Sequence, residues 1–239
     1  MKLITVGTGS EQGNCYLIKS NGRFTALDAG CKWKHVLVAT GFSVFAIEAC
    51  FLSHVHADHL EQVRSFIRCG VPIYTNEETA SKIGSNWYVG TPKPNTRNQF
   101  YSNNWFIPFD VPHTNTDGSD CRNYAYILDI DGERILYMTD WMYCPYNLRK
   151  FNINHFLIAI NYTDYPDDER SQHVLRGHAS LDTATEFLKT SMTDACRSIT
   201  GCHLSDKNAD EKLILSRLKE LAGENVTVNI ARKGETIDL

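Results

Sequence analysis

The sequence of 239 residues lacks the features of several protein classes. No apolar run approaches the roughly 18 residues that a membrane-spanning helix needs, so we expect no membrane contact. The opening MKLITVGTGS lacks the apolar core of a secretory signal. None of the eight cysteines forms a Cys-x-x-Cys pair, which argues against a cysteine zinc site. Together these absences predict a cytoplasmic protein with reduced thiols.

The sequence also has little net charge, at −4, and no linker rich in glycine, serine or proline. Broad duplex binding needs a lysine or arginine near each phosphate, so the acidic balance argues against it. Local basic patches remain open at Lys32 with Lys34 and at Arg149 with Lys150. Without a linker, we expect residues 1–239 to form a single domain.

Two hairpins are predicted at Asn21-Gly22 and at Asp131-Gly132, each between two apolar strands. Each hairpin has a tyrosine six residues before its turn glycine and an aspartate just past its second strand. These pairs are Tyr16 with Asp28 and Tyr126 with Asp140. The echo suggests a duplicated β-rich half.

Four helical segments are predicted among these strands. One follows residue 60 and stops at Gly70, one follows Asn76, one follows Ser180, and the last covers about 206–222. Residues 84–104 contain two prolines and several aromatics and predict a long loop, which can stack a base, act as a lid or pack against a partner. Strands in hairpin groups with interspersed helices favour two β-sheets with helices outside them.

The stretch SHVHADHLEQ, residues 53–62, concentrates metal-ligand chemistry at the end of a predicted strand. His54 and His56 point to the same side of an extended segment, so both imidazoles can reach one ion. The turn into the next helix aims Asp58 and His59 at a second position nearby. Imidazole and carboxylate ligands suit zinc, manganese or iron(II).

Four ligands cannot complete two metal sites, so further ligands are expected downstream. His113, Asp140 and His203 each follow an apolar stretch at the end of a predicted strand. A lone histidine is more often a surface residue than a ligand. The shared placement of these residues at strand ends favours the metal-binding interpretation.

HVHADH followed in order by His113, Asp140 and His203 resembles the metallo-β-lactamase superfamily. The resemblance implies a four-layer αββα sandwich of the α+β class, with two mixed β-sheets flanked by helices. It also implies two divalent ions, Zn²⁺ first and Mn²⁺ as the alternative. By analogy, site one would hold His54, His56 and His113, site two would hold Asp58, His59 and His203, and Asp140 would bridge them.

The resemblance also indicates one branch of this superfamily. Aspartate at position 140, where lactamases have cysteine, is similar to the hydrolase and phosphodiesterase members. GHASLDTATEFL with ITGCHLS, and the opening GTGSEQGNCYLI, resemble YycJ-type exonucleases and, less closely, tRNase Z. On this match His178 would be the general acid, the alternative being a helix N-terminal residue without a catalytic role. Asn161 replaces the glutamate of tRNase Z, and no basic arm is present, which disfavours tRNA processing.

The resemblance implies hydrolysis of a phosphodiester by a metal-bridged hydroxide, which Asp58 would orient while His178 protonates the leaving oxygen. The substrate would be a nucleic-acid end, as in the exonucleases, or a cyclic nucleotide, as in anti-Pycsar phosphodiesterases. A lactone, thioester or other small ester is the alternative. A binding protein that has lost catalysis is a further alternative. Related enzymes are often dimers, so a homodimer is one expected assembly.

Overall fold

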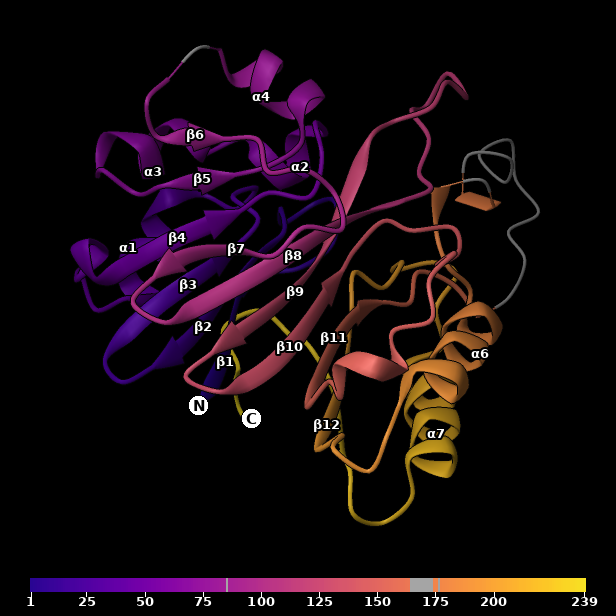
Figure 1. Cartoon of the computed structure of the whole chain (residues 1–239). Helices are drawn as coiled ribbons and strands as arrows, with labels where there is room; N and C mark the ends of the chain where they lie inside the picture. The colour runs from indigo at the N-terminus through magenta and orange to yellow at the C-terminus, as the bar shows by residue number, and fades with distance from the viewer. Residues whose placement is uncertain (85, 164–173, 176) are drawn as a thin grey trace.

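The computed structural model describes residues 1–84, 86–163, 174, 175 and 177–239, and it contains two mixed β-sheets that face each other with helices outside them (Figure 1). This is the four-layer sandwich that the sequence predicts. The first sheet has the order β14-β1-β2-β3-β4-β5-β6 and the second has the order β13-β12-β11-β10-β9-β8-β7.

The strand bounds are as follows. In the first sheet they are β1 Lys2–Gly7, β2 Cys15–Ser20, β3 Arg23–Leu27, β4 Ile47–Phe51, β5 Ile73–Tyr74, β6 Val89–Gly90 and β14 Thr236–Asp238. In the second they are β7 Asn98–Tyr101, β8 Asn104–Val111, β9 Asn123–Ile130, β10 Glu133–Met138, β11 His155–Ala159, β12 Ser198–Cys202 and β13 Thr227–Ile230.

Helices cover the outer face of each sheet (Figure 1). Those beside the first sheet are α1 Trp33–Ala39, η1 Val44–Ala46, α2 Ala57–Leu60, α3 Val63–Arg68 and α4 Glu77–Ile83. Those beside the second are η2 Arg149–Phe151, α6 Leu181–Ser191 and α7 Glu211–Ala222. In the described parts of the chain, no helix combines the length and apolar character that crossing a membrane requires.

The core follows from side-chain alternation along the strands. In β2, Tyr16 and Ile18 face the second sheet, whereas Cys15 and Leu17 face the layer of α1 and α3. Both faces of this strand are therefore buried, which explains its continuous apolar run. The resulting rigid sandwich holds the loops at its edge in fixed positions.

Both predicted hairpins are confirmed. The turn residues Asn21 and Gly22 have φ values of 48° and 78°, and Asp131 and Gly132 have 52° and 88°. Positive φ at both central positions is the geometry of a type I′ turn, which matches the twist of the flanking strands. The predicted caps are also present, because the side chain of Asn76 accepts a hydrogen bond from the backbone of α4 and that of Ser180 from the backbone of α6.

Two helix predictions were wrong at their starts. The helix expected after residue 60 is interrupted between α2 and α3, where the backbone N–H of Gln62 donates to the carbonyl of Ala29. The last helix starts at Glu211 because residues before it dock elsewhere, with the carbonyl of Asn208 accepting a hydrogen bond from the backbone N–H of Thr163. Tertiary hydrogen bonds therefore override the local helical pattern at both places.

The segment 84–104 is less irregular than predicted, because it contains β6 and β7. Its aromatic side chains pack on the sandwich: Phe100 contacts Phe51 with ring centroids 5.1 Å apart, and Tyr101 lies under the Arg23 guanidinium. Trp87, in contrast, is fully exposed. Phe100 and Tyr101 therefore pack within the chain itself, which none of the three interpretations of this segment had predicted.

Candidate metal centre

One edge of the sandwich collects the chain immediately after four strands. β4 leads to His54, β8 to His113, β10 to Asp140 and β12 to His203. β8 and β10 are both antiparallel to β9, and β10, β11 and β12 are parallel neighbours, so the carboxyl ends of β8, β10 and β12 lie at the same edge. The strand-end placement inferred from sequence therefore brings these side chains together.

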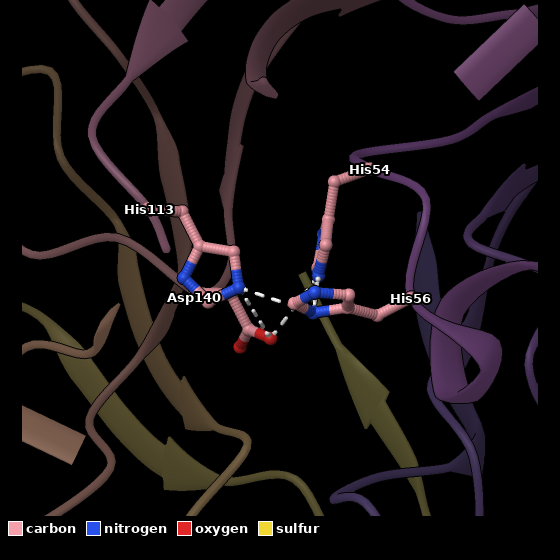
Figure 2. A group of neighbouring side chains, drawn as sticks. All are labelled: His54, His56, His113 and Asp140. Atoms are coloured by element: carbon pink, nitrogen blue, oxygen red, sulfur yellow. Dashed lines mark hydrogen bonds and ion pairs between the residues drawn. The ribbon is translucent and has the colours of Figure 1, made fainter. Parts of the chain in front are cut away.

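The first cluster, called cluster one, contains His54, His56, His113 and Asp140, whose ligand atoms all lie within 4.8 Å of one another. Figure 2 shows the four side chains pointing toward one another. The Nδ1 atom of His56 lies 3.0 Å from Nε2 of His54 and 3.2 Å from Nε2 of His113. A carboxylate oxygen of Asp140 lies 3.5 Å from Nε2 of His54.

The second cluster, cluster two, contains Asp58, His59, Asp140 and His203, again with ligand atoms within 4.8 Å of one another. The Nε2 atom of His59 lies 3.3 Å from Asp58 and 3.1 Å from Asp140. The Nε2 atom of His203 lies 3.3 Å from the other Asp140 oxygen. Asp140 is thus shared, and the seven residues predicted as metal ligands all lie in the two clusters.

The geometry fits divalent cations. In cluster one, the Nδ1 atom of His56 and the Nε2 atom of His113 lie 3.2 Å apart. When the outer N–H of each neutral ring donates to oxygen, both of these inner nitrogens carry lone pairs that face each other. In cluster two, the buried Nε2 atom of His203 faces carboxylate oxygens of Asp140 and Asp58 at 3.3 and 3.6 Å. Ligand atoms around tetrahedral zinc lie about 3.3 Å apart, which is close to the separations in both clusters.

Partners outside the clusters orient the rings. The Nδ1 atom of His113 lies 2.7 Å from the carbonyl oxygen of Gly177, and the Nε2 atom of His56 lies 3.0 Å from the Asn115 side-chain oxygen. An outer N–H that donates to oxygen leaves the inner nitrogen of the same ring with its lone pair directed at the cluster. Both imidazoles are thus held in the tautomer that can bind a metal.

Comparison with known families identifies the superfamily of the chain that carries the two clusters. The family model described as Beta-lactamase superfamily domain matches residues 38–196, more than half of the chain. The chain belongs to the metallo-β-lactamase superfamily. A second model, described as Anti-Pycsar protein Apyc1, matches residues 1–67. No curated protein sequence gives a significant match.

Several solved structures share the fold. Yeast PDE1 superimposes with a TM-score of 0.77 at 13% identity, covering 100% of this chain and 99% of its own. Zn²⁺-bound PqqB from Methylobacterium extorquens gives 0.75 at 13% identity, covering 100% of both chains. The short form of human tRNase Z gives 0.65 at 14% identity, covering 100% of this chain and 99% of its own.

Electrostatics differ between the clusters of this metallo-β-lactamase fold. In cluster one, burial lowers the pKa of His113 to about 3, and burial together with the charge of His59 holds the pKa of His54 well below its ordinary value. Both imidazoles are therefore neutral near pH 7 and have a lone pair available for a metal.

In cluster two the pKa values of the histidines are raised, not lowered. Although burial opposes it, the carboxylates of Asp58, Asp28 and Asp140 raise the pKa of His59 well above its ordinary value. The pKa of the Asp140 carboxyl also lies well below its usual range. Burial raises this pKa, but the nearby His203 and His59 lower it by more. Without a metal, the positive charge of the protonated imidazoles balances the negative charge of the carboxylates. A cation that binds here replaces those protons.

Asp28 is a buried site residue that the sequence interpretation missed. Its carboxylate lies 2.6 Å from Nδ1 of His59 and accepts hydrogen bonds from Ser53 and Tyr137. Asp28 has a φ of 59° just past β3, as Asp140 has 47° just past β10. The hairpin echo in the sequence already placed these two aspartates in equivalent positions and was the signal that could have identified Asp28.

Asn14 was also missed, although it lies in the GTGSEQGN stretch. Its side chain is buried, and its amide nitrogen lies 3.2 Å from the Asp58 carboxylate and 3.1 Å from Nε2 of His59. Its side-chain oxygen accepts a hydrogen bond from the backbone of Gly9. Asn14 therefore links cluster two to the loop that follows β1.

The variant Asp28→Asn is expected to bind metal at cluster two roughly 10- to 100-fold more weakly, because it loses the anionic partner of His59. Metal affinity should be measured by competition with a chromogenic chelator, with the melting temperature as a check on folding. Tyr137→Phe is the matched control, since it removes a hydrogen bond to Asp28 but leaves the contact with His59. Unchanged affinity in a folded Asp28→Asn protein would contradict the assignment.

His178, predicted as a general acid, lies beside the clusters and belongs to neither. Its Nδ1 atom is 3.5 Å from an Asp140 oxygen, and its ring stacks on that of His203 with centroids 5.7 Å apart. Its side chain is 11% exposed and lines a cavity next to the centre. This position allows contact with a substrate that approaches from the cavity.

Proposed function

We propose that this metallo-β-lactamase-fold hydrolase is a dinuclear metal-dependent phosphodiesterase acting on a nucleotide or nucleic acid, with a cyclic nucleotide as the preferred substrate. The observation that carries the proposal is the sharing of Asp140 between two complete clusters. Two ions at a shared carboxylate can act together on one phosphate. Zn²⁺ is the first choice and Mn²⁺ the alternative, because imidazole and carboxylate ligands suit both.

The comparisons support the choice of a phosphodiester. One of the solved structures with this fold is named PDE1 and another tRNase Z, and the N-terminal 67 residues match the anti-Pycsar model. The net charge of −4 favours a small nucleotide over a long duplex, because a duplex needs many basic contacts. A cavity of about 870 Å³ beside the centre has room for a nucleotide.

When bound, the two ions would supply a hydroxide nucleophile near neutral pH and would stabilise negative charge on the phosphate. The other roles belong to side chains of this chain. Asp58 is 21% exposed, so besides holding an ion it can accept a hydrogen bond from the attacking water and orient it. His178, next to Asp140, can give a proton to the leaving oxygen.

The test is a substrate comparison with protein stripped of metal by a chelator and then reloaded with Zn²⁺ or Mn²⁺. The substrates are bis-p-nitrophenyl phosphate, a 3′,5′-cyclic mononucleotide, a 5′-phosphorylated duplex and a simple lactone. We expect hydrolysis only after reloading, with the cyclic mononucleotide the best natural substrate. Turnover of the lactone alone would refute the phosphodiesterase assignment, and a protein that neither binds metal nor hydrolyses any substrate would favour the binding-protein alternative.

A further inference from the structure

The cavity of about 870 Å³ beside the metal centre is larger than a phosphodiester group needs. His178, His203 and residues 230–233 line it, together with two loops that are called its walls. The first wall is residues 8–12, after β1, and the second is residues 204–208, after β12. A substrate whose phosphate lies at the metal centre can extend into this cavity, where both loops can contact it.

Both walls are held rigidly to the centre. The backbone N–H of His203 donates to the Thr8 hydroxyl at 3.1 Å, which ties the start of one wall to the start of the other. In the second wall, the Ser205 N–H donates to the Asn161 carbonyl at 2.9 Å, and the Asn208 carbonyl accepts from the Thr163 N–H at 2.8 Å. A cavity with fixed walls is preorganised for a ligand of defined shape.

The charges of the described residues along the cavity balance one another. Among these residues, the lining contains three basic and three acidic side chains: Lys207, Arg232 and Lys233 against Glu11, Asp206 and Glu211. Arg232 is already engaged by Glu211 and by Glu235. The cavity therefore does not favour a second phosphate and suits an uncharged group that forms hydrogen bonds.

Two carboxamides supply the hydrogen-bonding groups. Gln12 lies in the first wall and Asn208 in the second, and within the described part of the chain neither side chain takes part in a hydrogen bond. The lining contains no phenylalanine, tyrosine or tryptophan among the described residues, so these rings are not available to stack a base. A carboxamide offers a donor beside an acceptor, as does an edge of each nucleobase.

Resting on the phosphodiesterase function proposed above, we infer that Asn208 and Gln12 bind the base of a nucleotide whose phosphodiester lies at the metal centre. The two residues determine which base is preferred, and they distinguish a nucleotide from a simple ester. Base selection here works by hydrogen bonding to the base edge.

The experiment compares metal-loaded wild-type protein with Asn208→Leu and Gln12→Met, which keep side-chain size but remove the donor and acceptor. The substrates are four 3′,5′-cyclic mononucleotides, the matching dinucleoside monophosphates and bis-p-nitrophenyl phosphate. We expect wild-type protein to prefer one base. In the variants, kcat/KM for that base, relative to bis-p-nitrophenyl phosphate, should fall by roughly 5- to 100-fold, mainly through KM.

Asn103→Leu in the exposed turn between β7 and β8 is the matched control and should behave as wild type. Asn208→Asp retains an acceptor but loses the donor, so it should change the order of preference among the bases, which a purely structural role would not do. Base preference that is identical in wild type, Asn208→Asp and both apolar variants would overturn the inference alone. Failure of loaded wild-type protein to hydrolyse any phosphodiester would overturn the proposed function as well.

Discussion

Asp140→Asn is expected to abolish hydrolysis, with kcat/KM for bis-p-nitrophenyl phosphate lower by roughly three orders of magnitude or more. Asp140 is the residue that both clusters share, and its two oxygens lie 3.1 Å from His59 and 3.3 Å from His203. Neutralising it removes a charged ligand from each cluster at once. Metal content per chain should fall in parallel, as measured by elemental analysis after dialysis.

Asp129→Asn is the matched control, because Asp129 lies on β9 of the same sheet and, among the described residues, forms an ion pair with Arg134 alone. It should retain wild-type metal content and rate. If Asp140→Asn kept two ions per chain and the wild-type rate, the shared-carboxylate arrangement would have no role in activity.

His178→Ala is expected to retain its metal but to lose roughly 10²- to 10⁴-fold in kcat on a nucleotide substrate. The imidazole lies 3.5 Å from Asp140 and outside both clusters, so its removal takes away a proton donor and leaves the ligands intact. The loss should be much smaller with bis-p-nitrophenyl phosphate. Its leaving group is a weakly basic phenolate that departs without protonation, whereas a sugar alkoxide needs a proton.

The leaving-group comparison separates an acid role from a structural one. A structural defect at His178 would slow both substrates equally and would change metal content or melting temperature. His35→Ala is the control, since His35 lies on α1 and is not among the residues that line the cavity. Equal loss on both substrates, or no loss on the nucleotide, would remove the acid assignment.

The metal-ligand positions could be predicted because four of them follow strands and the other three lie in the turn and short helix after β4. Apolar runs before His54, His113 and Asp140 predict strands, and polar residues after a strand must lie at a sheet edge. The HVHADH spacing also predicts which way the side chains point, because alternate residues of an extended segment lie on the same side. The type I′ turns were equally predictable, because asparagine or aspartate followed by glycine tolerates positive φ.

Other parts depended on contacts between distant segments. The interruption after α2 follows from the hydrogen bond between Gln62 and Ala29, which no local pattern contains. Asp28 becomes part of the centre only because β3 and β4 are parallel neighbours, so that the ends of both strands meet. The left-handed backbone of His203, with φ of 52°, is held by Thr8, 195 positions away in the chain.

By itself, the sequence determined the chemistry of this protein: imidazoles and carboxylates at strand ends, spaced to bind divalent cations. Local steric preference and side-chain alternation act within a few residues, so they can be read directly from sequence. The resemblance already implied Asp140 as the bridge between the two clusters, which the structure places in both. Only the tertiary structure decided that Asp28 supports His59 and that Gln12 and Asn208 line one cavity. Those relations arise from the packing of two sheets, which brings together side chains that no short-range rule connects.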